Sequence, residues 1–309
     1  MQRYQECRLC PRDCGADRAA GQLGFCGETA ECRVASYGPH YGEEPCFSGT
    51  RGSGTLFFSG CSSQCFFCQN HQISLGHHGR AMSADQLHAS AHQMIRAGVH
   101  NLNFVTPDHF WPHIEELCGR LRAEGATLPF LFNSSGYQAP EMVVRYAEWM
   151  DIFLPDFKFA EPDLAFVCMR DRRYPELTLE ALRRMVAAKG FLEPWDPEGG
   201  ALATRGVLVR HLVLPGYVAN SLAVLRLLRA EFGPLLPLSV MSQFQPVENC
   251  MERRHLDRSV TSAEYEQVCQ AVEELGFRHV FVQPHGGDAA FLPDFHRDSP
   301  FRGNTRRSG

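Results

Sequence analysis

The sequence lacks several features that would assign the protein to a common class. No apolar run is long enough to cross a membrane, and the first residues, 1–6, lack the apolar core of a signal peptide. The formal net charge is −5 and no long basic run is present, so nothing predicts binding to nucleic acid or to an acidic membrane. No Gly-Lys-Ser or Gly-Lys-Thr occurs, which argues against a phosphate-binding loop. We therefore expect a cytoplasmic protein.

Cysteine, in contrast, is abundant, with 13 among the 309 residues. The odd number, the clustering before residue 70 and the missing signal peptide argue against a secreted disulfide scaffold. Reduced thiolates are natural ligands of zinc and of iron–sulfur clusters, so metal binding is the first interpretation and core packing the second. Four cysteines stand singly near predicted helices and are expected to be packing residues: Cys118, Cys168, Cys250 and Cys269.

The most informative stretch is a short loop that directly follows the apolar run 55–58. It carries three cysteines, separated by three and then two residues: Cys61, Cys65 and Cys68. Structural zinc sites and ordinary ferredoxin clusters need four protein ligands. Three thiolates on one loop instead suit a cubane cluster whose fourth iron is left open for another ligand. Phe67 stands beside the last cysteine, where its ring would shield the cluster or a bound adenine. The competing interpretation is three unligated, buried cysteines.

Residues 1–50 are predicted to form a separate, loop-rich module, because they are rich in Cys, Gly, Arg and Pro and show no period of 2.0 or 3.6. Four of its cysteines have spacing suitable for one tetrahedral site, namely Cys7, Cys10, Cys14 and Cys26, with Cys32 and Cys46 as spare candidates. Zinc and a fully ligated iron–sulfur cluster fit equally well by residue type, and unligated thiols are the alternative. A module with so few aliphatic residues buries little core, so a metal would supply its folding free energy.

Beyond residue 50 the pattern changes to short apolar strands that alternate with amphipathic helices, and we assign 51–290 to one domain and 291–309 to a C-terminal tail. Strands are predicted at 55–59, 101–105, 129–132, 151–154, 206–214, 238–242 and 279–283. Helices are predicted at 84–97, 113–123, 140–148, 175–188, 220–232 and 262–275. Such alternation with short connections predicts an α/β fold with a parallel sheet, closed or partly closed into a barrel.

Polar, Gly- and Pro-bearing segments follow nearly every predicted strand, whereas the opposite strand ends differ. In a barrel these segments share one rim, where active groups gather. The candidate residues at this rim are Thr106, Asn133, Ser134, Asp156, Lys158 and, on the strand 206–214, Arg210. A strand-to-helix turn with a capping serine is an equally good reading of Asn133 and Ser134.

The spacing of Cys61, Cys65 and Cys68 resembles the signature of the radical S-adenosylmethionine (SAM) superfamily. The segments 105–107, 154–158 and 212–216 look like the branch related to pyruvate formate-lyase activating enzymes, and more closely like uncharacterised members of it. This resemblance implies a partial (β/α)6 TIM-like barrel with a [4Fe-4S] cluster, whose open iron is chelated by SAM. Reductive cleavage of SAM would give methionine and a 5′-deoxyadenosyl radical, which abstracts a hydrogen atom from a substrate.

The resemblance also suggests roles for the rim residues. Thr106 occupies the place of a Gly-Gly-Glu type segment that meets the SAM amino group. Asp156 and Lys158 match an Asp-Leu-Lys segment, in which the lysine would neutralise the methionine carboxylate. Arg210 is a second candidate cation. Asn133 and Ser134 suit hydrogen bonds to the ribose or to backbone groups.

The substrate stays open at this point. An activase would act on a glycyl-radical protein and would need an open rim, and its electron donor would be a flavodoxin or a ferredoxin. This chain has no ferredoxin-like insert between Cys68 and Cys118, which weakens that assignment. A small-molecule or peptide-modifying enzyme would have a closed pocket, roofed by the insertion 193–202 or by 291–301.

In a low-potential enzyme an auxiliary cluster at Cys7–Cys26 is attractive. The rival from another class is a non-enzymatic iron–sulfur or zinc protein.

Overall fold

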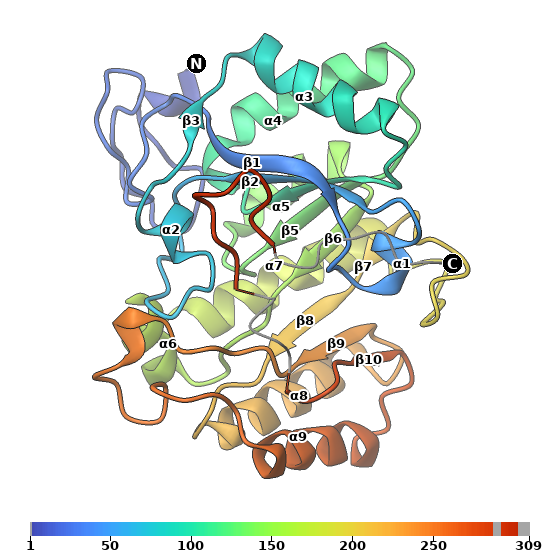
Figure 1. Cartoon of the computed structure of the whole chain (residues 1–309). Coiled ribbons are helices and arrows are strands. Elements are labelled where there is room, and N and C mark those ends of the chain that lie inside the picture. The colour runs from blue at the N-terminus through green and yellow to red at the C-terminus, as the bar shows by residue number, and fades with distance from the viewer. Residues whose placement is uncertain (1, 287–291, 302–309) are drawn as a thin grey trace.

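The structure, a computed structural model, describes residues 2–286 and 292–301 (Figure 1). The strands are β1 (Arg33–His40), β2 (Ser53–Phe58), β3 (Arg80–Ala81), β4 (Leu102–Val105), β5 (Phe130–Ser134), β6 (Ile152–Pro155), β7 (Gly206–Val207), β8 (Val209–Leu212), β9 (Leu238–Met241) and β10 (Val280–Val282). The α-helices are α1 (Pro45–Ser48), α2 (His71–Ser74), α3 (Ala84–Arg96), α4 (Trp111–Ala123), α5 (Pro140–Trp149), α6 (Pro162–Met169), α7 (Tyr174–Lys189), α8 (Val218–Phe232) and α9 (Ser262–Glu274). Short 3₁₀ turns are η1 (Gln2–Tyr4), η2 (Asp108–Phe110) and η3 (Glu248–Cys250).

The strands form one curved, mainly parallel array. Strands β2, β4, β5, β6 and β7 are successive parallel neighbours, and β8, β9 and β10 form a second parallel sheet. The two sheets meet where Leu208 alone separates β7 from β8, and a parallel bridge joins Asp156 to Arg210. Helices α3 and α4 lie on one side of the array, and α8 and α9 lie on the other (Figure 1). This is the predicted α/β fold with a mainly parallel sheet.

The buried strands and the first residues of the helices explain why the sequence pattern predicts an alternation of strands and helices. Strands β2 and β6 are buried along their whole length, as expected for parallel strands covered on both faces. Helices α3 and α9 each begin with a capping box, formed by Ser83 with Gln86 and by Thr261 with Glu264.

Three features differ from the sequence-based expectation. The predicted strand 206–214 is split, because the Leu208 amide bonds to Phe153 O (3.1 Å) while β8 pairs with β9. Helix α6 was not anticipated. Strand β1 lies inside the segment expected to be loop-rich, and it joins the main sheet by antiparallel pairing with β2. The division of the chain at residues 50 and 290 stays a prediction.

The core between the sheet and helices α4 and α5 is aromatic. The Phe132 ring stacks on Tyr146 with 4.5 Å between ring centroids, and Trp111 meets Tyr146 at 4.6 Å. All three side chains are fully buried. The Tyr146 hydroxyl donates to Leu9 O at 3.3 Å. This core therefore extends into the N-terminal segment, residues 2–32, which precedes β1.

A buried arginine fixes the N-terminal segment to the barrel. The Arg18 side chain is 1% exposed, and its guanidinium donates to the carbonyl oxygens of His109 (2.6 Å), Glu28 (3.0 Å) and Thr29 (2.7 Å). A buried guanidinium is tolerated only when its donors are satisfied. Within the described ranges, no helix is long and apolar enough to span a membrane.

Gly136 allows the turn after β5 to pack against the turn after β6. Its φ is +77°, and a Cβ atom there would lie 1.9 Å from Asp156 O. Both the backbone conformation and the space therefore require glycine.

We predict that Gly136→Ala lowers the free energy of unfolding by about 1–3 kcal/mol more than Gly125→Ala. Gly125 is the matched control, because its φ is +87° but a Cβ there would meet nothing within 4 Å. Both variants bear the left-handed penalty of roughly 1–2 kcal/mol, and only Gly136→Ala adds the clash. Urea denaturation of both variants measures the difference, and equal midpoints would contradict the packing argument.

Candidate active site

A cavity of about 550 Å³ lies at the carboxyl ends of the parallel strands. Its wall is built from segments that follow β2, β4, β6 and β9, from the end of β5 and from β8. All the residues predicted to bind the cluster or SAM line it: Cys61, Cys65, Phe67, Cys68, Thr106, Asn133, Ser134, Asp156, Lys158 and Arg210. The structure thus brings these side chains to one place.

The cysteine loop is buried and closely packed. Cys61 and Cys65 are buried, and Cys68 is partly buried. Gly60 begins the loop with a φ of +75°, and a Cβ atom at this position would lie 2.4 Å from Glu28 Cγ. The N-terminal segment therefore presses directly on the start of the loop, and only glycine permits this approach.

Arg12 holds the loop from outside the cavity. Its guanidinium donates to Ser62 O (2.9 Å), Ser63 O (3.1 Å) and, at the end of α6, Arg170 O (3.2 Å). Its side chain is 6% exposed and lies 4.0 Å from the centre of the Phe25 ring. Because the guanidinium is planar and its donors are fixed in direction, these contacts set the path of the loop backbone.

The hydroxyl groups of the loop connect it to two neighbouring strand ends. Ser62 donates to Asp108 Oδ2 at 2.6 Å, and Ser63 donates to Ser135 Oγ at 2.6 Å. Burial raises the pKa of Asp108, although the Ser62 hydrogen bond opposes this. The loop is therefore fixed to the segments that follow β4 and β5.

The thiols of the loop lie in surroundings that disfavour ionisation. Burial raises the pKa of Cys61 to about 12, and it also raises the pKa of Cys65 and of Cys68. The Lys158 ammonium acts in the opposite direction on Cys65 and Cys68. A metal binds the thiolate form of cysteine. Because Lys158 only partly offsets the effect of burial, the metal itself must supply most of the positive charge that stabilises these thiolates.

Thr106 has a strained backbone. It follows β4 with a φ of +49°, a region that a β-branched residue rarely adopts. Its amide donates to Asn133 O at 2.8 Å, which holds this conformation against the end of β5. Strain of this kind costs about 1–3 kcal/mol and is concentrated at functional sites. The geometry is consistent with the position assigned to Thr106.

Lys158 and Asp156 form an ion pair in the cavity wall, and both side chains are mostly buried. Burial lowers the pKa of Lys158, but the Asp156 carboxylate more than offsets this and leaves the pKa above its ordinary value. The Lys158 amide donates to the hydroxyl of buried Tyr174 at 3.0 Å, and Asn220 donates to Lys158 O at 2.9 Å. The ammonium is therefore charged and its backbone is held in place.

Arg210 also lines the cavity, but its charge is already engaged. Its guanidinium donates to both carboxylates of Glu43 and Glu44, which are 7% and 8% exposed. Glu43 also accepts from Asn103 at 2.8 Å and from Asn133 at 3.4 Å. Burial raises the pKa of Glu43, but Arg210 and His40 more than offset it, so the pKa lies below its ordinary range. Arg210 is thus less available than Lys158 to a ligand carboxylate.

Sequence reasoning missed several residues of the cavity. Glu43 and Glu44 lie in the segment that was read as part of a separate module, and only their adjacency to Pro45 hinted at an ordered turn. Asn70 closes the cysteine loop, and its buried Oδ1 has no hydrogen-bond partner among the described residues. An unpaired buried acceptor is costly and suggests a polar ligand at this position.

The cavity therefore fits an iron–sulfur cluster with one open iron. Three cysteines line it, and no fourth cysteine does so within the described part of the chain. The three thiols, the positive charge of Lys158 and the unpaired Asn70 oxygen suit a [4Fe-4S] cluster with SAM bound beside it.

The N-terminal cysteines are only partly gathered. Cys7, Cys10 and Cys26 are buried, whereas Cys14 is exposed and its sulfur lies 3.9 Å from Cys7 O. The Arg18 guanidinium lies 3.6 Å from the Cys7 sulfur. In a zinc tetrahedron the sulfurs would be about 3.8 Å apart. Within residues 2–286 and 292–301, the cysteines form no group of three sulfurs within 4.8 Å of one another.

Two segments from outside the strand ends also contribute to the cavity wall. Pro197, from the predicted insertion 193–202, and Phe301, from the C-terminal segment, both line it. Phe295 and Phe301 each pack against Phe57 with 5.4 Å between ring centroids. Of the predicted roof 291–301, residue 291 lies outside the described residues.

Comparison with known proteins agrees with this site. Residues 55–192 match the sequence model of the radical SAM superfamily. This matched range includes the cysteine loop and the Asp156–Lys158 segment. An uncharacterised protein of Methanocaldococcus jannaschii is 23% identical over 284 residues, which are 90% of this chain and 77% of that protein.

Solved structures with a similar fold include methylornithine synthase, at 12% identity and a TM-score of 0.48, covering 74% of this chain and 69% of that chain. SuiB of Streptococcus suis bound to S-adenosylmethionine is similar at 10% identity and a TM-score of 0.49, covering 72% of this chain and 48% of that chain.

Proposed function

We propose that Cys61, Cys65 and Cys68 hold a [4Fe-4S] cluster and that the protein is a radical SAM enzyme, which cleaves SAM reductively at this cluster. The match of residues 55–192 to the radical SAM superfamily supports the proposal. The observation that carries this proposal is the cavity, which combines three thiols, two of them buried and one partly buried, with the charged Lys158. When bound, the cluster and SAM supply one-electron cleavage of a carbon–sulfur bond and abstraction of a hydrogen atom from the substrate.

The residues of this chain bind and orient these groups. Lys158 faces the cavity and neutralises the methionine carboxylate of SAM, while Asp156 holds the ammonium in position. Asn70 Oδ1, which has no partner among the described residues, accepts a hydrogen bond from a polar group of SAM, and Thr106 forms a second hydrogen bond to SAM. Phe67 and Phe244, whose ring centroids are 5.8 Å apart, keep water from the cluster side of the cavity.

An external donor must deliver the electron, and a flavodoxin or a ferredoxin has a suitable potential. The thirteen cysteines are free thiols, which suits a reducing compartment. We therefore place the reaction in the cytoplasm.

We predict that Cys61→Ser, Cys65→Ser or Cys68→Ser abolishes formation of 5′-deoxyadenosine from SAM after anaerobic reconstitution and reduction. Each change removes one of three thiolates, so a second iron loses its protein ligand and the cluster is no longer held in its active form. Cys269→Ala is the control, because Cys269 lies on α9 and does not line the cavity. Cleavage of SAM by a triad variant that retains a reducible cluster would exclude the assignment. Absence of cleavage by the native enzyme would favour a non-enzymatic iron–sulfur protein.

We further propose that Cys7, Cys10, Cys14 and Cys26 hold an auxiliary iron–sulfur cluster. The support is the buried Arg18, whose donors go to carbonyl oxygens and to the Cys7 sulfur rather than to a carboxylate. Such a cation offsets the negative charge of thiolates bound to a metal. The sulfurs are not at the spacing of a zinc site, and the same holds for Cys61, Cys65 and Cys68. Metal analysis of the Cys61, Cys65 and Cys68 variants, which lack the first cluster, tests this second site. About four iron atoms per chain would indicate an auxiliary cluster at the N-terminal cysteines, and about one zinc atom would indicate a zinc site.

We predict that Lys158→Met weakens SAM binding by about 30-fold or more, which corresponds to roughly 2 kcal/mol. The change removes the cation that meets the SAM carboxylate and leaves Asp156 without its partner. The double variant Asp156→Asn/Lys158→Met removes that unpaired charge and separates the two effects. Equilibrium dialysis with labelled SAM measures the affinity. Unchanged binding in both variants would show that the carboxylate is held elsewhere.

We infer that the substrate is a small molecule or the end of a peptide rather than a loop of a folded glycyl-radical protein. The support is that Pro197, from the insertion, and Phe301, from the C-terminal segment, both contribute to the cavity wall, whereas an activase needs an open rim. The absence of a ferredoxin-like insert after the cysteine loop agrees with this. The glycyl-radical activase remains the second candidate. Incubation with a glycyl-radical protein under turnover conditions, followed by electron paramagnetic resonance, tests it, and a glycine-centred signal would reverse our inference.

A further inference from the structure

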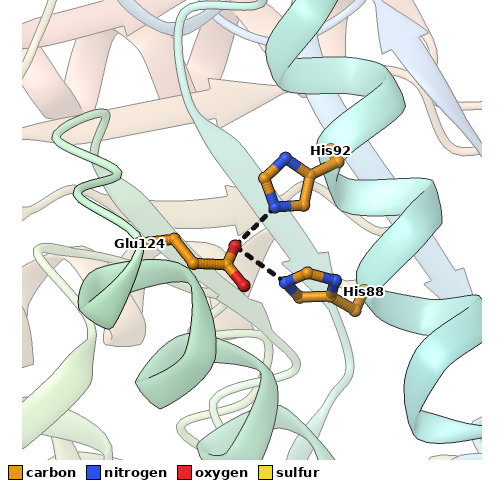
Figure 2. Close-up of side chains that lie close together, drawn as sticks. All are labelled: His88, His92 and Glu124. Carbon is orange, nitrogen blue, oxygen red and sulfur yellow. Dashed lines mark hydrogen bonds and ion pairs between the residues drawn. The ribbon is translucent and has the colours of Figure 1, made fainter.

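A group of metal-binding side chains lies between helices α3 and α4, outside the cavity. His88 and His92 are one turn apart on α3, so their rings point from the same face of the helix. Glu124 is the residue that caps the C-terminus of α4. Figure 2 shows both imidazoles directed at the carboxylate of Glu124. None of the three residues lines the cavity.

The ligand atoms converge on one point. His88 Nε2 lies 2.9 Å from Glu124 Oε2, and His92 Nε2 lies 2.6 Å from the same oxygen (Figure 2). The two imidazole rings are 4.5 Å apart between centroids. Within residues 2–286 and 292–301, this is the one group of three or more His, Cys, Asp or Glu residues whose ligand atoms lie within 4.8 Å of one another.

The chemistry of the set suits a divalent transition metal. Two imidazoles and one carboxylate, with a water in the fourth position, form a common open zinc site. In such a site the ligand atoms stand about 3.3–3.5 Å apart, so each nitrogen–oxygen pair needs to open by less than about 1 Å. Glu124 can make this movement because its side chain is 44% exposed, whereas the His88 side chain is 16% exposed and is held by the helix.

The charges favour a metal over a simple hydrogen-bonded group. The Glu124 carboxylate has no Lys or Arg partner among the described residues, so a divalent cation would compensate a charge that no ammonium or guanidinium offsets. The nearby Arg120 does not offset this charge, because its guanidinium donates to Asp85 Oδ1 at 2.9 Å. Among the described residues, the ion pairs of Glu124 are with His88 and His92.

We propose that His88, His92 and Glu124 form a second kind of metal site, which binds zinc or a similar divalent transition metal and links α3 to α4. The site is built from nitrogen and oxygen ligands, unlike the thiolate sites. It is independent of SAM cleavage, because it lies on the outer helices and shares no residue with the cavity. Its sequence signal is the spacing His-x₃-His, but Glu124 is too distant along the chain to be associated with it in advance.

The experiment is zinc binding to the reconstituted holoenzyme, in which the cluster ligands are occupied by iron. We predict that the native enzyme binds one equivalent of zinc with a Kd of about 10 µM or lower, and that His88→Ala/His92→Ala weakens this affinity at least 10-fold. Glu124→Gln keeps the size of the side chain and should also weaken binding. Equilibrium dialysis followed by metal analysis measures both quantities.

Arg120→Ala is the matched control, since it also breaks an ionic contact between α3 and α4 but removes no ligand. It should retain full zinc affinity. All variants should retain SAM cleavage, which shows that they are folded and separates this proposal from the proposed function. Equal zinc binding by the native enzyme and the double histidine variant would overturn the proposal. Loss of binding in Arg120→Ala, or no binding by the native enzyme, would overturn it as well.

Discussion

The cysteine loop, Cys61–Cys68, depends on the Arg12 guanidinium, which bonds to the backbone within the loop and to the backbone that follows α6. Arg12 comes from the N-terminal segment and donates to Ser62 O and Ser63 O in the loop and to Arg170 O beyond α6. The loop has no regular secondary structure of its own before Asn70, so its shape is imposed by such contacts. The close approach of Gly60 to Glu28 adds a steric constraint from the same segment. The N-terminal segment is therefore part of the support of the active site.

This dependence couples the N-terminal cysteines to the cavity. Arg18 fixes the segment to His109 in η2, and Ser62 reaches Asp108 in the same turn. A metal at the N-terminal cysteines would order the segment that presents Arg12 and Cys26, whose carbonyl accepts from the Cys61 amide at 3.4 Å. Loss of that metal would then change the packing of the cysteine loop, although the N-terminal metal would not touch the loop itself.

Much of the fold and the cavity could be predicted from the sequence, and the reason is local. The parallel strands are short and mostly apolar, and nearly all are followed by polar residues, so the positions of Thr106, Asp156 and Lys158 at one rim could be derived. The failures concern interactions between distant segments. Nothing in the run Gly42–Pro45 shows that Glu43 meets Arg210, which lies 167 positions further along the chain. Likewise β1 is only half-buried and contains Gly38 and Pro39, so it lacks the apolar pattern of a strand. The split at Leu208 follows from pairing with different neighbours, which periodicity does not reveal.

The ion group of Glu43, Glu44 and Arg210 has an electrical consequence for the cavity. Two buried carboxylates share one guanidinium, and the Asp156–Lys158 pair on the same wall is neutral. One negative charge is therefore left over in a region of low dielectric constant, where its field is weakly screened. That field draws cationic groups, such as a sulfonium or an amine, toward the wall formed by β8 and repels phosphate esters and other anions. A cationic group is therefore favoured over an anionic one near these carboxylates, before any hydrogen bond to it forms.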